Sequence, residues 1–279
     1  MKFNNTQVMN FEGAFRGLRN PLESWDKSDS IYYYITDDTS YEDFDIDEII
    51  ENLIIKDHPD VDKYSYEYDD YFGEYLDMVD AASLINLRGG IEEHFWLGPN
   101  DMNLAHRMIK AGSSDRKFMR QIMVSVDITA PLYWWKEFDT YKVGTTANST
   151  STMHKLASTP ITIDCFEMDD FPTEEELLMY ENSPYSLPIY ISEYWDMLIN
   201  DLEYLRKKYN ETKDKRWWKE LIRLLPEAWL QTRTVTLNYE ILRNIYSQRK
   251  NHRLSEWHTF CSWIQLLPYS HDLIRYGLD

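Results

Sequence analysis

Two stretches of the chain alternate apolar and polar residues in the way that β-strands do. Between residues 121 and 129, Ile and Val recur at every second position, and residues 230–237 alternate similarly and are rich in Thr and Val. A period of two with β-branched side chains is typical of pleated backbone. We therefore expect these segments to be strands of one small sheet.

Helical spacing follows the second of these strands. Asn238 is a good N-cap, and the apolar residues Ile241, Leu242 and Ile245 come next at helical spacing, which predicts a helix. Arg249 lies in its last turn, where a cation complements the helix dipole and still reaches a phosphate. On periodicity alone, a buried amphipathic helix that ends in a solvated Arg explains the pattern equally well.

Further helices are predicted on either side of the strands. Residues 98–112 begin with a Gly-Pro-Asn turn and end at a Gly, and Pro131 suits the first turn of a short helix. Residues 191–209 form an amphipathic pattern whose apolar face consists of Tyr194, Leu198, Leu202 and Leu205. The fold class that follows is α+β, with a small mixed or antiparallel sheet flanked by helices.

The polar residues of the late segment resemble a known signature. Leu225 and Pro226, a strand that ends at Asn238, and a helix that carries Asn244 and Arg249 are similar to the C-terminal signature of flavin-dependent thymidylate synthases. The resemblance implies that both Asn residues lie against FAD. It also implies that Arg249 binds the nucleotide and acts in catalysis.

The resemblance extends over residues 104–264, and it weakens beyond the helix. The family continues with an Ala-Gln-x-Glu segment, where this chain has Leu254, Ser255 and Trp257. Arg223 lies one position from a nucleotide-binding Arg of the family, so we expect it to bind substrate. The resemblance also implies a homotetramer with sites shared between subunits.

A second family motif, Gln-x-x-Arg-His-Arg followed by a Glu-x-Ser-x-Arg-like segment, is replaced in this chain. The residues at its positions are Glu137, Thr140, Tyr141, Lys142, Asn148, Thr150 and Thr152. From the resemblance we expect Glu137, Lys142 and Thr150 to bind substrate. We expect Thr140, Tyr141, Lys142 and Asn148 to bind the flavin.

The replacements change what these positions can do. An Arg-to-Thr exchange removes a planar fork of donors that pairs with phosphate or a ring oxygen. Lys142 retains one cationic point, and Tyr141 provides a flat wall that can form hydrogen bonds. The Ser/Thr/Asn-rich run 145–152 offers hydroxyl and backbone N–H groups to phosphate oxygens. Without the resemblance, such a run indicates an ordinary loop.

Charge and composition narrow the function classes. The chain has 279 residues, a formal net charge of −19 and two Cys. Such acidity disfavours duplex nucleic acid and acidic membranes as partners, and two Cys provide neither a disulfide scaffold nor a Cys-rich zinc site. With no signal peptide and no apolar run of about 20 residues, we expect a cytoplasmic protein without a metal.

The first hundred residues differ from the rest. Residues 32–80 are acidic and rich in Tyr, and they match no calcium-binding loop. Arg16 and Arg19 are cations in this acidic half that could reach an anionic ligand, but we expect them to balance Glu12 and Glu23 instead. We divide the chain into a divergent N-terminal region, 1–100, and a flavin-dependent thymidylate synthase-like domain, 101–279.

Two functions remain open from the sequence. The first is an FAD-dependent enzyme that transfers a one-carbon unit to C5 of a pyrimidine deoxynucleoside monophosphate, dUMP or a related nucleotide, with NADPH and methylenetetrahydrofolate as cosubstrates. The second is an inactive relative that retains the fold as a nucleotide-binding or assembly protein. The bound flavin, visible as a yellow colour, distinguishes them.

Overall fold

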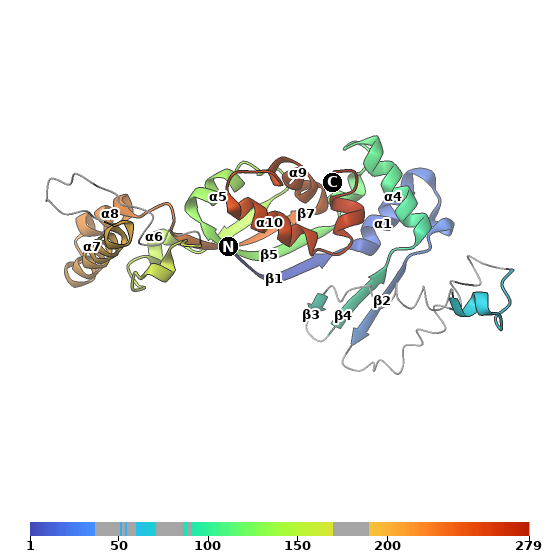
Figure 1. The fold of residues 1–279 in the computed structure, drawn as a ribbon, viewed down its shortest axis with the longest axis horizontal. Helices are drawn as coiled ribbons and strands as arrows, with labels where there is room; N and C mark the ends of the chain where they lie inside the picture. The colour runs from blue at the N-terminus through green and yellow to red at the C-terminus, as the bar shows by residue number, and fades with distance from the viewer. Residues whose placement is uncertain are drawn as a thin grey trace. The chain divides into compact units, whose positions relative to one another are not determined.

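The structure is a computed structural model that describes residues 1–36, 51, 54, 60–70, 86–88, 91–169 and 190–278. The chain forms two compact units (Figure 1). Unit 1 consists of Met1–Asn4, Asp127–Lys142 and Thr146–Val235, and unit 2 consists of Asn5–Val126, Val143–Thr145 and Thr236–Asp279.

A four-stranded sheet contains the two predicted strands. Its order is β1 (Lys2–Met9), β5 (Met123–Pro131), β7 (Leu230–Asn238) and β6 (Thr146–Ser149). The predicted strands are thus confirmed as hydrogen-bonded neighbours, β5 and β7. β5 starts two residues later than expected because the N–H of Gln121 closes a turn onto the carbonyl of Phe118.

Unit 2 contains most of the aromatic core around the sheet. Its helical elements are α1 (Phe11–Arg19), η1 (Asn20–Leu22), η2 (Trp25–Lys27), α4 (Pro99–Ala111), η4 (Lys117–Arg120), α9 (Tyr239–Arg249), α10 (Ser255–Gln265) and the π-helix η6 (Ser270–Ile274). The ring of Phe11 stacks on Phe95 at 3.9 Å and meets the edge of Tyr239 at 5.6 Å. α10 is held to β1 by a hydrogen bond from Trp263 Nε1 to Thr6 Oγ1.

A second, antiparallel sheet belongs to unit 2. It consists of β2 (Ile31–Thr36), β4 (Ile91–Trp96) and β3 (Asn86–Arg88), in that order. The α+β fold with a small sheet and flanking helices is therefore confirmed.

Unit 1 includes two helices that pack against each other. Its elements are α5 (Leu132–Phe138), α6 (Thr152–Lys155), η5 (Ile163–Cys165), α7 (Ile191–Thr212) and α8 (Lys215–Leu224), and α7 and α8 lie side by side (Figure 1). The prediction of which residues form the apolar face of α7 is wrong at one position. Tyr194 is 45% exposed, and Trp195 packs beside Leu198, Leu202 and Leu205 instead.

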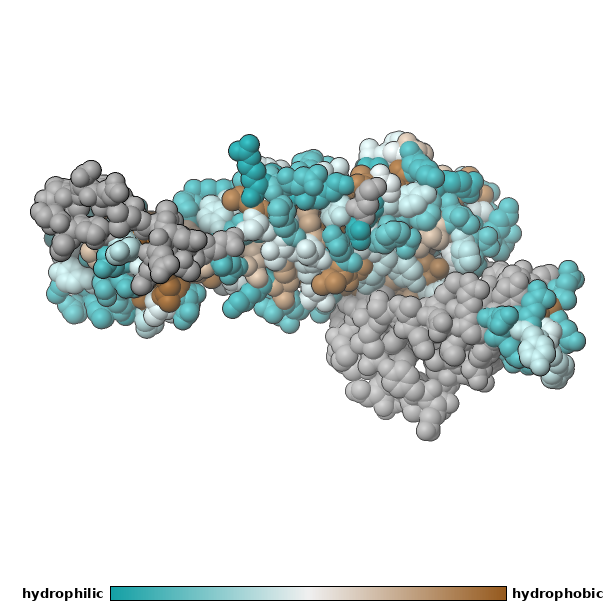
Figure 2. Space-filling model, viewed as in Figure 1, coloured by the Kyte–Doolittle hydropathy of each residue, from teal (hydrophilic) through white to brown (hydrophobic). Residues whose placement is uncertain are grey.

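The acidic, Tyr-rich stretch lies mostly outside the described residues, although residues 66–70 are helical. The division at residue 100 therefore stays a prediction. Figure 2 shows one face of the molecule, on which hydrophilic side chains predominate among the described residues. None of the helices in the described part combines the length and apolar composition needed to cross a membrane.

Candidate functional site

The junction between β7 and α9 forms as the signature predicts. Asn238 ends the strand, and its side-chain oxygen accepts a hydrogen bond of 3.1 Å from the N–H of Ile241. The Asn238 side chain is buried, so this amide caps the helix from inside the fold.

A short loop packs against this cap. Gly144 has a φ of +76°, and a Cβ placed on it would lie 2.9 Å from Ile241 Cδ1 and 3.6 Å from Asn238 Nδ2. A side chain at Gly144 would therefore both strain the backbone and collide with α9. The absence of a Cβ lets the loop at residues 143–145 approach the start of the helix.

Asn244 and Arg249 project from different sides of α9. Residues five positions apart on an α-helix are rotated by about 140°. Asn244 is exposed, and its Oδ1 accepts a 2.8 Å hydrogen bond from Gln248 Nε2. The Arg249 guanidinium lies 4.6 Å from the centre of the Trp257 ring.

The predicted residues of unit 1 follow the end of α5. Thr140 Oγ1 donates a 2.7 Å hydrogen bond to the carbonyl of Glu137, so this hydroxyl closes the helix. The Tyr141 ring lies 6.4 Å from Phe138, and Lys142 is exposed.

Two more predicted residues lie on the surface of this unit. Asn148 is exposed on β6. Arg223, expected to bind nucleotide, forms an ion pair with Glu220 one turn earlier on α8. The guanidinium that we expected to bind substrate is thus paired with a carboxylate of its own helix.

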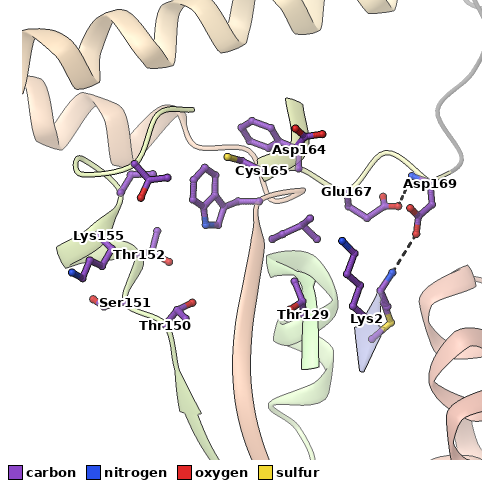
Figure 3. A pocket seen from close by; sticks show the side chains of 16 residues that line it. Lys2, Thr129, Thr150, Ser151, Thr152, Lys155, Asp164, Cys165, Glu167 and Asp169 are labelled. Atoms are coloured by element: carbon purple, nitrogen blue, oxygen red, sulfur yellow. Dashed lines mark hydrogen bonds and ion pairs between the residues drawn. The ribbon is translucent and has the colours of Figure 1, made fainter. Parts of the chain in front are cut away.

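Thr150 lines a polar cavity of about 420 Å³ in unit 1. The cavity is lined by Met1, Lys2, Thr129, Thr150, Ser151, Thr152, Lys155, Leu156, Thr159, Asp164, Cys165, Phe166, Glu167, Asp169, Trp229 and Leu230. Figure 3 shows hydroxyl-bearing Thr150, Ser151 and Thr152 close to Lys155. The carboxylates Glu167 and Asp169 lie apart from this cluster, near Lys2 (Figure 3).

A partly buried hydrogen-bond network holds the hydroxyl side of the cavity. Gln231 Nε2 donates hydrogen bonds to the carbonyl of Thr150, at 3.0 Å, and to Thr152 Oγ1, at 3.3 Å. The Gln231 side-chain oxygen accepts a 2.9 Å hydrogen bond from Arg233 Nε, and Arg233 Nη1 donates one of 2.7 Å to Asp139 Oδ1. Gln231, which is 9% exposed, thus ties the loop of Thr150 and Thr152 to β7.

The opposite side is held by the chain's first residue. The amino group of Met1 lies 3.2 Å from Asp169 Oδ2, and the Asp169 N–H donates to Glu167 Oε1 at 2.8 Å. Of the residues that line this cavity, only Thr150 was predicted from the sequence as a substrate contact. Thr152 was placed only at a replaced family Arg position, and Lys2, Lys155 and these acids were not predicted. Only the polar run 145–152 was a signal, since nothing local links Met1 to residue 169.

The two cysteines differ in environment. Cys165 is half-buried in the cavity wall, whereas burial of Cys261 raises its thiol pKa to about 11. In the described ranges no group of three or more His, Cys, Asp or Glu side chains is arranged to hold a metal ion.

Comparison with known proteins identifies the fold. No protein-family model matches the sequence, and no curated protein sequence matches it. The chain is similar to the crystal structure of thymidylate synthase X from Helicobacter pylori with FAD and dUMP, with a TM-score of 0.53 and 14% identity. That alignment covers 100% of this chain and 99% of the other, which supports a similar fold for the part of the chain that the structure describes.

Two further structures match part of the chain. A flavin-dependent thymidylate synthase from Helicobacter pylori, complexed with FAD and dUMP, has 15% identity, a TM-score of 0.46, and coverage of 65% of this chain and 84% of that one. A UMP/dUMP methylase from Streptomyces cacaoi, bound with 5-Br UMP, has 12% identity, a TM-score of 0.44, and coverage of 64% and 84%.

Proposed function

We propose that this protein is an FAD-dependent enzyme that transfers a one-carbon unit to C5 of a pyrimidine nucleoside monophosphate, dUMP or a close relative. The observation that supports the proposal is the β7–Asn238–α9 junction. An Asn at the signature position ends the strand and begins the helix, in a chain whose fold is similar to that of thymidylate synthase X.

The predicted flavin ligands have suitable chemistry. Asn238, Asn244 and Asn148 carry amides, Thr140 and Tyr141 carry hydroxyls, and Lys142 carries an ammonium group. Such groups pair with ring carbonyls, ring nitrogens and pyrophosphate oxygens. Except for the buried Asn238, these side chains are exposed or half-buried, so a bound flavin can reach them. When bound, the reduced flavin would supply the hydride, with NADPH as its reductant.

Arg249 is the proposed substrate and catalytic residue. The guanidinium lies 4.6 Å from the centre of the Trp257 ring, and this contact restricts its position. A guanidinium held in this way pairs bidentately with a phosphate or with ring oxygens at lower entropic cost than a mobile one. Arg249 and both signature Asn residues belong to unit 2, whereas the other seven proposed residues belong to unit 1.

The unit 1 cavity is our proposed site for the nucleotide phosphate. Thr150, Ser151 and Thr152 bring three hydroxyls beside Lys155, a set of donors that suits phosphate oxygens. The carboxylates on the other side would repel a phosphate, so the phosphate is expected among the hydroxyls. Two further residues stay predicted substrate contacts: Glu137, which precedes this polar loop in the sequence, and Arg223.

The second candidate is a nucleotide-binding or assembly protein without catalysis. It is favoured by how two of the predicted binding residues are engaged. The Thr140 hydroxyl, at a family Arg position, bonds to the Glu137 carbonyl, and Arg223 pairs with Glu220. Neither replaces the donor fork that the family uses. A purified protein that is colourless and takes up no FAD would support this candidate.

Release of the C5 hydrogen tests the enzyme directly. Purified protein is supplied with FAD, NADPH, methylenetetrahydrofolate and dUMP tritiated at C5, and in parallel with tritiated UMP. The proposal predicts FAD-dependent release of tritium to water with at least one nucleotide. Bound flavin and nucleotide without any release would contradict the enzyme and support the inactive relative. Light scattering on the same preparation tests the proposed homotetramer.

A further inference from the structure

Unit 2 contains a second polar cavity, of about 620 Å³, on one face of α4. Asn100, Asn103 and Arg107 line it from the helix. Their spacing of three and four residues puts all three side chains on the same face. Ser24 and Lys27 line it from the η1–η2 segment, and Arg19 at the end of α1 completes the polar wall.

The cavity is positively charged although the chain is acidic. Its lining contains Arg19, Lys27 and Arg107 and no carboxylate. Lys27 and Arg107 are exposed and form no side-chain hydrogen bond or ion pair with the described residues. Two cations therefore face the same space without an internal counter-charge.

Two buried acids of these segments, Asp101 and Asp29, are engaged by other groups, and the exposed Glu23 and Asp26, which precede Lys27 in sequence, do not line the cavity. Asp101 accepts 2.6 Å hydrogen bonds from both Ser28 Oγ and Ser30 Oγ, in addition to its ion pair with Arg19. Asp29 accepts the backbone N–H groups of Asn100 and Asp101 at 2.7 and 3.0 Å. These bonds hold both carboxylates in the protein, so they do not neutralise Lys27 and Arg107.

Arg19 supplies an independent sign of a missing ligand. It is 4% exposed. Its Nε donates a 2.5 Å hydrogen bond to Asp101 Oδ1, and its Nη1 donates a 3.2 Å hydrogen bond to the carbonyl of Ser24. Its Nη2 is buried and has no hydrogen-bond partner. A buried charged donor without an acceptor is costly, and an anion in the adjoining cavity would provide one.

The alternative location for that acceptor is less suitable. Arg19 also lines a cavity of about 330 Å³, whose lining includes Glu12 and Arg16. Those two side chains form an ion pair with each other, whereas Lys27 and Arg107 have no such partner among the described residues, so the cavity beside α4 is the better match.

The geometry points to a binding site for a small phosphorylated molecule between α4 and the η1–η2 segment. Lys27, Arg107 and the Arg19 Nη2 take the phosphate, and the amides of Asn100 and Asn103 bond to the organic part. A volume of about 620 Å³ is in the range of small-molecule sites. None of these residues belongs to the flavin or nucleotide set proposed above, so this site is additional to that function.

Titration calorimetry with inorganic phosphate and pyrophosphate at low ionic strength tests the site. The variants Lys27→Gln and Arg107→Gln each remove one cation from the exposed rim without disturbing the buried Arg19–Asp101 pair. We expect each to weaken pyrophosphate binding at this site about tenfold, the loss of one charge-assisted contact, and the double variant to remove this binding event, so that at most the separate one of the unit 1 cavity is left. Thermal unfolding of each variant verifies that the fold is intact.

Matched controls separate local binding from net charge. Lys117→Gln and Arg253→Gln make the same charge changes at exposed positions that do not line the cavity, and we expect pyrophosphate affinity within twofold of the original. Equal weakening by controls and cavity variants would overturn the site, as would absence of binding by the unmodified protein. FAD and dUMP are titrated into Lys27→Gln as well. Failure of the proposed function would appear as absent FAD or dUMP binding, whereas failure of the site beside α4 would appear only in the pyrophosphate titrations.

Discussion

The guanidinium of Arg249 lies 4.6 Å from the centre of the buried Trp257 ring. Trp257 takes the position at which the thymidylate synthase signature has a Glu. An aromatic face attracts a cation through its π electrons. The exchange therefore places a ring beside the Arg249 guanidinium at the position where the signature has a carboxylate.

Trp257→Phe tests that relationship. A smaller ring keeps the core apolar but weakens the cation–π contact, whose strength is on the order of 0.5–1 kcal/mol or more. We expect the dUMP dissociation constant to rise about two- to fivefold, measured by calorimetry. Trp263→Phe is the control, because Trp263 is on the same helix but bonds to Thr6. If both variants bind dUMP alike, Trp257 has no special role in positioning Arg249.

Asp101→Asn should destabilise unit 2 strongly. The carboxylate is fully buried and holds Arg19 at 2.5 Å. Removing one partner of a buried pair leaves an uncompensated charge, which costs about 3–5 kcal/mol. Urea unfolding measures this cost. Ser30→Ala removes a hydroxyl that donates to the same carboxylate and accepts from the Gly98 N–H, and it should cost only about 2 kcal/mol. Comparable losses in the two variants would show that the buried charge is not the main source of the lost stability.

Glu203 should make unit 1 sensitive to acid. Hydrogen bonds from Arg206, supported by one from the Ile161 N–H, lower the Glu203 pKa to about 2. Because the folded pKa lies below the ordinary value of 4.5, the carboxylate stabilises the fold above pH 4.5. That contribution is lost as the pH falls from 4.5 to 2.

Thermal unfolding across this pH range checks the prediction. We expect Glu203→Gln to be less stable than the unmodified protein at pH 6, and the difference to shrink toward pH 2. Glu211→Gln removes an exposed carboxylate that pairs with Lys208 and should show little effect. A Glu203→Gln difference that stays constant with pH would contradict the assignment.

Cys165 provides a natural reporter of the unit 1 cavity. It is half-buried there, while Cys261 is buried with its pKa raised to about 11. At pH 8 a thiol reagent should therefore modify Cys165 first, because Cys261 is neither accessible nor ionised. Mass spectrometry identifies the modified residue, and Cys165→Ser should lose the fast phase. Saturating dUMP should slow labelling, and unchanged labelling would argue against a nucleotide in this cavity.

Local patterns predicted the parts of the fold that depend on local sequence. The alternation in β5 and β7 and the cap at Asn238 follow from side-chain period and capping chemistry, and both are present. The apolar face of α7 was wrong at Tyr194 because Tyr194 and Trp195 are both large aromatics, and only packing shows which one faces the core.

Contacts between distant residues could not be predicted in this way. Arg16 does pair with Glu12, at 3.5 Å. Arg19 was expected to balance Glu23 but pairs with Asp101, 82 positions away, since that carboxylate is buried beside it. The cavity of unit 1 likewise joins Met1 to Asp169 across 168 positions. A sequence pattern contains no signal for such pairs.

The most direct test of the proposed function is to bind FAD first and dUMP second, to the unmodified protein and to Arg249→Ala. FAD binding is measured by fluorescence and dUMP binding by calorimetry, with Arg253→Ala as a control for charge. Our account predicts FAD binding by all three proteins and dUMP binding at least about tenfold weaker in Arg249→Ala alone. Equal dUMP affinity in Arg249→Ala, or no FAD binding by the unmodified protein, would contradict it.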